Sequence, residues 1–198
     1  MRNIITLTYL VAGLLLSIIP ANASSITGTP HDLSNRSMGS TETCKFCHIP
    51  HNANPNKVSP LWNRIIGETP YKIYTSDSRK TDENQPTLTS QTRLCLSCHD
   101  GSTAMDVGEG SHMIDKSKVI SLTTDHPVSV MYANNPVVVA GKFKQATSTK
   151  FVDANLQLPL YGGNLECGTC HNPHDNQFGS FLRVSNAKSE LCFSCHIM

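Results

Sequence analysis

The chain has 198 residues, with 16 Lys and Arg against 15 Asp and Glu, so its formal net charge at pH 7 is only +1. This balance gives no electrostatic basis for binding nucleic acid or an anionic membrane, and we expect neither as a partner. The length allows one compact domain. Aromatic residues make up only 6% of the chain, however, which is little for an ordinary core of this size.

The first element in the chain is a secretory signal peptide, predicted over residues 1–23. Arg2 precedes an apolar stretch from Ile4 to Ile19, and Ala21-Asn22-Ala23 supplies the small residues of a cleavage site. The alternative is a retained membrane anchor, but the apolar stretch is shorter than the ~20 residues that span a bilayer. No later stretch is long enough, so we expect a secreted mature chain, 24–198, without stable membrane insertion.

All eight cysteines fall in copies of the motif Cys-x-x-Cys-His. The four copies are Cys44-Lys45-Phe46-Cys47-His48, Cys95-Leu96-Ser97-Cys98-His99, Cys167-Gly168-Thr169-Cys170-His171 and Cys192-Phe193-Ser194-Cys195-His196. In a c-type haem site the two thiols form thioether bonds to the haem vinyl groups, and the adjacent histidine becomes the proximal ligand of the iron. The motifs therefore predict four covalently bound haems, with the proximal iron ligands His48, His99, His171 and His196.

Paired cysteines have other uses, namely a zinc ribbon, a redox-active dithiol or a framework of disulfides. None of these explains why a histidine follows the second cysteine in every copy. Four macrocycles would also supply the apolar interior that the composition lacks. We therefore expect the chain without haem to be largely unfolded.

The motifs form an internal repeat. The first and third continue as His-x-Pro-His, whereas the second and fourth read Leu-Cys-x-Ser-Cys-His. This alternation divides the mature chain into two modules, at about 24–105 and 160–198, with a connecting segment between them. Because neighbouring haems must lie close together to exchange electrons, we expect both modules to form one domain.

Regular secondary structure is expected to be sparse. Short helices are predicted at 90–98 and 186–195, where an N-cap serine introduces a segment that runs into a haem motif. β-Branched residues at 118–122 and 137–140 predict short strands, which could pair in one small sheet. Proline and glycine punctuate the remainder. The expected fold class is a multihaem cytochrome c, with short helices and coil wrapped around a chain of four haems.

Five histidines remain outside the motifs, and four irons need four distal ligands, so the count fits two histidines on every iron. His51 and His174 each follow a proximal histidine by three residues, with a proline between, and neither can reach the opposite face of that haem. We predict that each ligates a neighbouring haem. His31 and His126 are the other predicted distal ligands, and His112, in a glycine-rich run, is the surplus histidine. Methionine is the alternative distal ligand, but no spacing favours one.

The chain resembles the doubled-motif multihaem c-type cytochromes. Besides the paired motifs, the resemblance is carried by Cys-His-Ile-Pro-His-Asn-Ala at 47–53, Pro60-Leu61-Trp62-Asn63, Cys98-His99-Asp100-Gly101-Ser102, Asp125-His126-Pro127 and the segment 181–187. Within this family the chain is most similar to small tetrahaem proteins of the OmcE type, which assemble into extracellular filaments. The resemblance implies low-spin haems with two histidine ligands, stacked in alternating parallel and T-shaped pairs. It supports His31 and His126 as ligands, and implies that a histidine such as His31 or His112 can serve a neighbouring subunit.

Three functions are compatible with these residues. The first is an electron-transfer protein that joins other copies of itself, head to tail, into a conducting filament at the cell surface or outside the cell, and passes electrons to extracellular acceptors. The second is a monomeric periplasmic shuttle between redox partner proteins, ending at a terminal reductase. The third is an enzyme, which needs an open iron position that this supply of histidines does not require. We expect no enzyme, and we favour the filament because the balanced charge provides no docking face for brief encounters.

Overall fold

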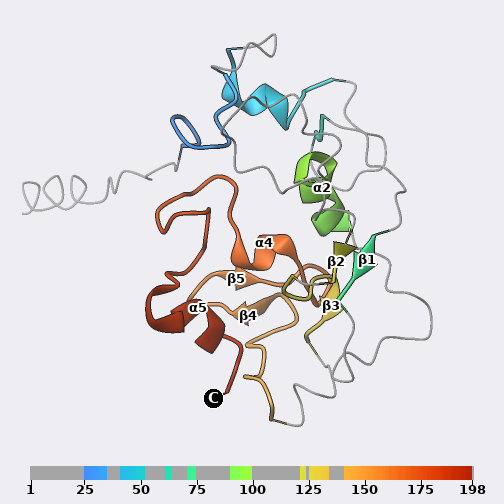
Figure 1. The fold of residues 1–198 in the computed structure, drawn as a ribbon, viewed down its shortest axis with the longest axis vertical. Coiled ribbons are helices and arrows are strands. Elements are labelled where there is room, and N and C mark those ends of the chain that lie inside the picture. The colour runs from blue at the N-terminus through green and yellow to red at the C-terminus, as the bar shows by residue number, and fades with distance from the viewer. Residues whose placement is uncertain are drawn as a thin grey trace, which may run out of the picture.

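The structure is a computed structural model of the chain (Figure 1). It describes residues 25–34, 41–51, 61–63, 71–74, 90–99, 121–123, 125–133 and 141–197. The predicted signal peptide, the predicted strand at 137–140 and His112 lie outside the described residues.

Helices and strands are short throughout the described part of the chain. The helical elements are η1 (Thr43–Phe46), α2 (Ser90–His99), α4 (Cys167–Cys170), η2 (Ala187–Ser189) and α5 (Glu190–Phe193). The strands are β1 (Lys72–Ile73), β2 (Ser121–Leu122), β3 (Val130–Met131), β4 (Phe151–Asp153), β5 (Leu158–Pro159) and β6 (Asn164–Leu165). None of the helices in these ranges has the length and apolar character that a membrane crossing requires.

The two predicted helices have different outcomes. The helix predicted at 90–98 is confirmed as α2, which extends to His99. The prediction of one continuous helix over 186–195 is wrong, because the structure has two short helical elements there. Lys188 and Ser189 have φ angles of 53° and 62°, in the left-handed region, and this break separates the 3-10 turn η2 from α5.

The described strands pair in separate two-stranded sheets. β1 and β2 are parallel, with Ile73 opposite Leu122, so the C-terminal end of the strand predicted at 118–122 is confirmed as β2. The pairs β3–β6 and β4–β5 are antiparallel. Neither β1 nor the strands of these antiparallel pairs was expected from the sequence.

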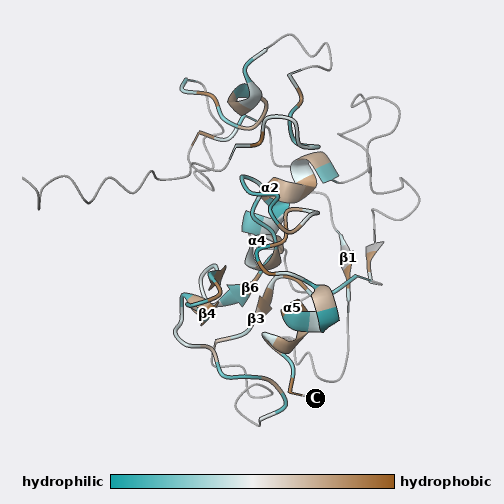
Figure 2. Cartoon of the chain, turned by 90° about the vertical axis from the view of Figure 1, so that its left-hand side faces the viewer, coloured by the Kyte–Doolittle hydropathy of each residue, from teal (hydrophilic) through white to brown (hydrophobic). Residues whose placement is uncertain are grey.

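Beside the motifs, the C-terminal half has a hydrophobic cluster of its own. Its buried members are Tyr132, Ala133, Val152, Leu158, Leu160, Leu165 and Val184. The cluster takes Val152 from β4, Leu165 from β6 and Tyr132 from the residues that follow β3, and Figure 2 shows these three strands in one part of the molecule. A smaller cluster joins Ile73 of β1 to Leu96 of α2. Aliphatic side chains therefore build part of the interior next to the haem motifs.

Helices α2 and α4, which carry the second and third motifs, pack against each other. Gly168 N donates a hydrogen bond to Gln91 Oε1 at 3.0 Å. An added Cβ at Gly168 would collide with the side chains of Gln91 and Tyr161, so any larger residue would have to displace them. Thr92 Oγ1 donates to the buried carboxylate of Glu166, one residue before α4. A helix of the first module thus contacts a helix of the second.

Candidate functional site

Each Cys-x-x-Cys-His motif contains a helical turn. In three motifs the amide of the histidine donates to the carbonyl of the first cysteine, at 2.8 Å for His48 and Cys44, 3.0 Å for His171 and Cys167, and 2.9 Å for His196 and Cys192. The second motif lies inside the continuous helix α2. Residues i, i+3 and i+4 of a helical turn share one face, so both thiols and the histidine of a motif point to the same side.

No disulfide joins any of the eight cysteines in the structure. In the ranges that the structure describes, no group of three or more His, Cys, Asp or Glu side chains converges as a zinc site requires. The thiols of Cys95 and Cys167 are in hydrogen-bonding contact, and this contact is the largest cause that raises the pKa of Cys95. The second and third motifs, where haem attachment is predicted, therefore adjoin.

The third and fourth motifs are also neighbours. Desolvation, followed by the electrostatic effect of Cys195, raises the pKa of Cys170 to about 11. These two residues are the second cysteines of their motifs. The second, third and fourth motifs thus follow one another through the molecule.

Three predicted proximal histidines face a predicted distal histidine. The ring centres lie 5.9 Å apart for His99 and His31, 6.2 Å for His48 and His174, and 6.4 Å for His196 and His126. A bond between a transition metal and an imidazole nitrogen is about 2 Å long, which places two imidazoles on opposite sides of one ion with their centres roughly 6 Å apart. All three pairs have this spacing, so these residues fit an iron held between two imidazoles.

Backbone carbonyls hold several of the rings through Nδ1. The Nδ1 atom lies 3.5 Å from Pro173 O in His31, 3.1 Å from Pro127 O in His126, and 2.8 Å from Ser180 O in His171. An Nδ1–H group that donates to a carbonyl leaves Nε2 without a proton. That tautomer is the one in which an outer hydrogen bond orients a metal-ligating histidine.

Electrostatics favour the neutral rings as well. Desolvation by the surrounding atoms is the largest cause that lowers the pKa of His31, His99, His174 and His196, although the rings of His99 and His174 keep contact with solvent. Neighbouring imidazoles lower the pKa further: His31 acts on His99, His48 on His174 and His126 on His196. These are the three facing pairs. The neutral form is the one that ligates metal.

The fourth predicted proximal ligand has no such partner among the described histidines. His171 lies close enough to His31 and His99 to lower the pKa of both, but it faces neither ring. His51 is exposed and faces none of the described imidazoles. The prediction that His51 ligates a neighbouring haem stays a prediction, as does the role of His112.

Two aromatic side chains that the sequence does not assign to the sites contact ligand histidines. The ring of Phe181 stacks on His31, with centres 4.1 Å apart and an interplanar angle of 15°. Trp62 lies edge-on to His48 at 5.8 Å, and its Nε1 donates to Ser97 Oγ at 3.2 Å. Both residues stand in segments that carry the family resemblance, which is the one signal in the sequence that points to them.

Residues 159–197 match the family model of the doubled CXXCH motif. This segment contains α4, α5 and the third and fourth motifs. A search of curated proteins finds no match to the chain. The doubled motif supports a multihaem c-type cytochrome with covalently bound haem, and it favours an electron-transfer protein over an enzyme.

Proposed function

We propose that the chain is a tetrahaem c-type cytochrome that carries electrons along a row of haems, with each iron held between two imidazoles. The observation that carries this proposal is the spacing of the three histidine pairs, 5.9, 6.2 and 6.4 Å between ring centres. When bound, the haem irons supply reversible one-electron exchange.

The residues of the chain have distinct roles in this proposal. The eight motif cysteines anchor the macrocycles covalently, and His48, His99, His171 and His196 are the proximal ligands. Their distal partners are His174 for His48, His31 for His99 and His126 for His196, while His171 takes His51 or His112. Neutral imidazoles on both sides leave no open position for a substrate, which supports transfer of electrons rather than catalysis.

The order of the sites supports a continuous row. The thiol of Cys95 interacts with that of Cys167, and Cys195 acts electrostatically on Cys170, so the second, third and fourth motifs are adjacent in turn. The first motif joins the row through His174, which is contributed by the second module.

We further propose that copies of this chain assemble head to tail into a secreted filament outside the cell. The resemblance to filament-forming tetrahaem proteins and the near-zero net charge support fixed contacts between copies. The alternative is a monomeric periplasmic shuttle.

Haem content tests the first proposal. The pyridine haemochrome assay and the intact mass of the mature protein are expected to give four covalent haems per chain, with a fully low-spin absorption spectrum. A smaller number of haems, or binding of CO to the reduced wild-type protein, contradicts the proposal.

Electron microscopy tests the second. The haem-loaded protein is purified from culture medium and the cell surface without denaturant, and examined in negative stain. Uniform thin fibres that contain this chain support the filament, whereas dispersed particles of monomer size contradict it and support the shuttle.

A further inference from the structure

The segment from Asn172 to Leu182, named here the 172–182 loop, leaves the third motif and returns beside it (Figure 1). Asn172 N donates to Phe181 O at 2.7 Å, and Leu182 forms an antiparallel bridge with His171. Inside the loop, Phe181 N donates to the side chain of Asn176 at 2.8 Å. The loop is therefore closed at its base and braced from within.

The 172–182 loop contacts predicted iron ligands of three different sites. Ser180 O accepts a hydrogen bond from Nδ1 of His171 at 2.8 Å. The loop itself carries His174, which faces the histidine of the first motif. Pro173 O lies 3.5 Å from Nδ1 of His31, which faces the histidine of the second motif. One short segment thus meets ligands of the first, second and third haem sites.

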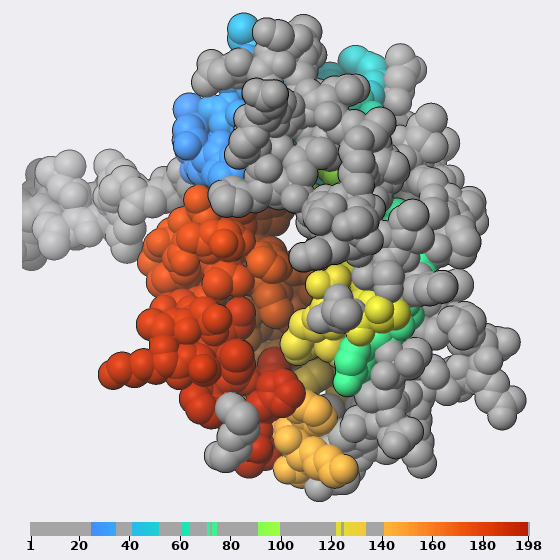
Figure 3. All heavy atoms as spheres, in the orientation of Figure 1, coloured from blue at the N-terminus to red at the C-terminus, as the bar shows by residue number. Residues whose placement is uncertain are grey.

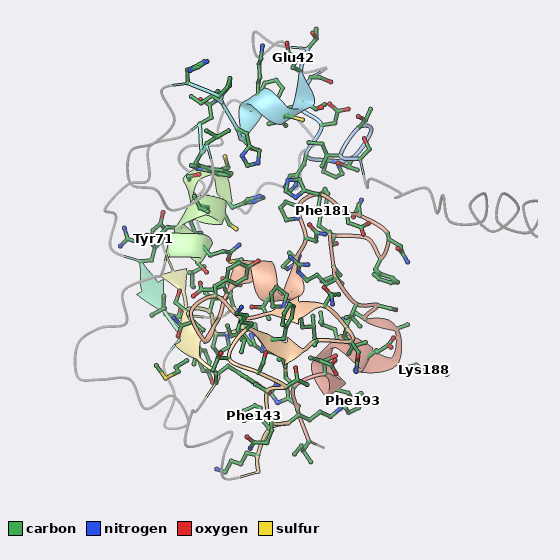
Figure 4. The ribbon with its side chains drawn as sticks, turned by 180° about the vertical axis from the view of Figure 1, so that it is seen from behind. Glu42, Tyr71, Phe143, Phe181, Lys188 and Phe193 are labelled. Carbon is green, nitrogen blue, oxygen red and sulfur yellow. The ribbon has the colours of Figure 1, made fainter. Side chains whose placement is uncertain are left out.

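A further contact of the loop joins the ring of Phe181 to that of His31. The ring centres are 4.1 Å apart and the planes differ by only 15°, so the two rings stack. The Phe181 side chain is buried, with 8% of its surface exposed. Figure 4 shows Phe181 where the C-terminal half approaches the N-terminal segment, and Figure 3 shows residues 25–34, in blue, resting on that half. The loop therefore fixes the orientation of an imidazole that comes from the opposite end of the chain.

The backbone adopts a rare conformation at this contact. Ser180 and Phe181 have φ angles of 48° and 56°. Two consecutive non-glycine residues in the left-handed region are strained, and they keep this conformation only where the surrounding structure holds them. The turn places the Ser180 carbonyl on His171 and the Phe181 ring on His31. Strain that coincides with ligand contacts is typical of a functional constraint.

We propose that Phe181 is a positioning residue whose ring fixes the plane of the His31 imidazole as the distal ligand of the iron held by His99. The inference rests on the proposed function, because it presupposes that iron. A residue that orients a ligand without touching the metal tunes the site through that ligand.

Low-temperature EPR of the oxidised, haem-loaded protein tests the proposal, since the g values of a low-spin ferric haem depend on the angle between the planes of its axial imidazoles. Loss of one low-spin signal in His31→Ala identifies the signal to follow. Phe181→Leu removes the flat ring, Phe181→Trp replaces it with a larger one, and Phe181→Tyr retains it. The matched control is Phe178→Leu, because Phe178 lies in the same loop and is 45% exposed.

We expect Phe181→Leu to retain four covalent haems and to shift the largest g value of the His31 signal alone, while Phe181→Tyr keeps the wild-type value. The control variant is expected to have the wild-type spectrum. An unshifted signal in both Phe181→Leu and Phe181→Trp overturns the proposal. Loss of covalent haem from both variants also overturns it, because positioning leaves attachment at Cys95 and Cys98 intact. A wild-type protein with fewer than four haems or with high-spin iron instead contradicts the proposed function itself.

Discussion

The imidazole of His174 faces that of His48 across 6.2 Å, although the first belongs to the second module and the other to the first. The three-residue spacing from His171 to His174, with Pro173 between them, predicts that His174 ligates a different haem from His171, and the proximity of His174 to His48 is compatible with that prediction. In the proposed ligand set, the first haem site therefore draws on both modules. A consequence is that neither module can complete its own set of iron ligands alone.

We predict that His174→Ala converts one haem of four from low-spin to high-spin, because the iron held by His48 loses its sixth ligand. All four haems stay attached, since the motif cysteines are unchanged. CO binding to the reduced protein measures the change, with an expected uptake of about one CO per chain against none in the wild type. Gln177→Ala, an exposed neighbour in the 172–182 loop, serves as control and should bind no CO. A fully low-spin His174→Ala protein contradicts the pairing.

The buried carboxylate of Glu166 leads to a second prediction. It accepts hydrogen bonds from Thr92 Oγ1 of α2 and from Ser129 Oγ, the latter at 3.1 Å, and only 1% of the residue is exposed. Glu166→Ala leaves both hydroxyl groups without this acceptor and opens a cavity, so the free energy of unfolding should fall by roughly 2–4 kcal/mol. Glu166→Gln retains an acceptor oxygen and should lose less.

Denaturant unfolding of the haem-loaded protein, followed by absorbance, measures the effect of the Glu166 variants. Glu190→Ala is the control, because Glu190 is exposed on α5 and its loss should change the free energy of unfolding by no more than about 0.5 kcal/mol. If Glu166→Ala is as stable as Glu190→Ala, the link between α2 and α4 does not stabilise the fold.

The sequence predicts the haem motifs and α2 because both depend on local spacing. A helical turn requires only neighbouring residues, and the cysteines and histidine of a motif then share a face. Strands such as β1 and β6 could not be predicted, since two residues are too few to show alternation. The break at Lys188 and Ser189 was missed because neither is glycine, the usual signal for a positive φ.

In the candidate site, too, local features could be predicted from the sequence and contacts between distant segments could not. The proximal histidines follow from the motif. The expectation that His174 does not ligate the haem of His171 follows from their three-residue spacing and from Pro173 between them. The partner of each distal histidine depends instead on how distant segments meet, as for His31 and His99. The stacking of Phe181 on His31 arises from a left-handed turn in a loop, and no residue pattern predicts that turn.

A third prediction concerns the hydrophobic cluster of the C-terminal half. Leu158 is 1% exposed within it, and Leu158→Ala should lower the free energy of unfolding by about 2–5 kcal/mol through lost apolar burial and a cavity. The low-spin spectrum should stay unchanged, since the cluster contains none of the predicted iron ligands. Met131→Ala, at a side chain that is 57% exposed, is the matched control and should cost little. Equal stability of both variants would show that haem, rather than this cluster, holds the half together.

The last prediction concerns Asp32, which closes the turn that presents His31. Its Oδ2 accepts the Gly28 N–H group at 2.8 Å, and its Oδ1 accepts the Ser34 hydroxyl at 2.5 Å and the Ser34 N–H group at 3.1 Å. The hydroxyl of Ser34, followed by the amide of Gly28, lowers the pKa of this carboxyl, as expected when several donors stabilise the ionised form.

Asp32→Ala should therefore loosen the turn and weaken the attachment of His31 to its iron, whereas Asp32→Asn, which keeps one acceptor, should have an intermediate effect. Because these hydrogen bonds to the ionised carboxylate hold the turn, their loss should let His31 dissociate from its iron more often. The reduced Asp32→Ala protein should then bind CO at one haem, more slowly than His31→Ala, whereas the wild type should bind none. Ser25→Ala, which removes an exposed acceptor for Thr27 N, is the control and should behave as the wild type. If Asp32→Ala, like the wild type, binds no CO, then Phe181 and Pro173 hold His31 in place without the turn that Asp32 closes.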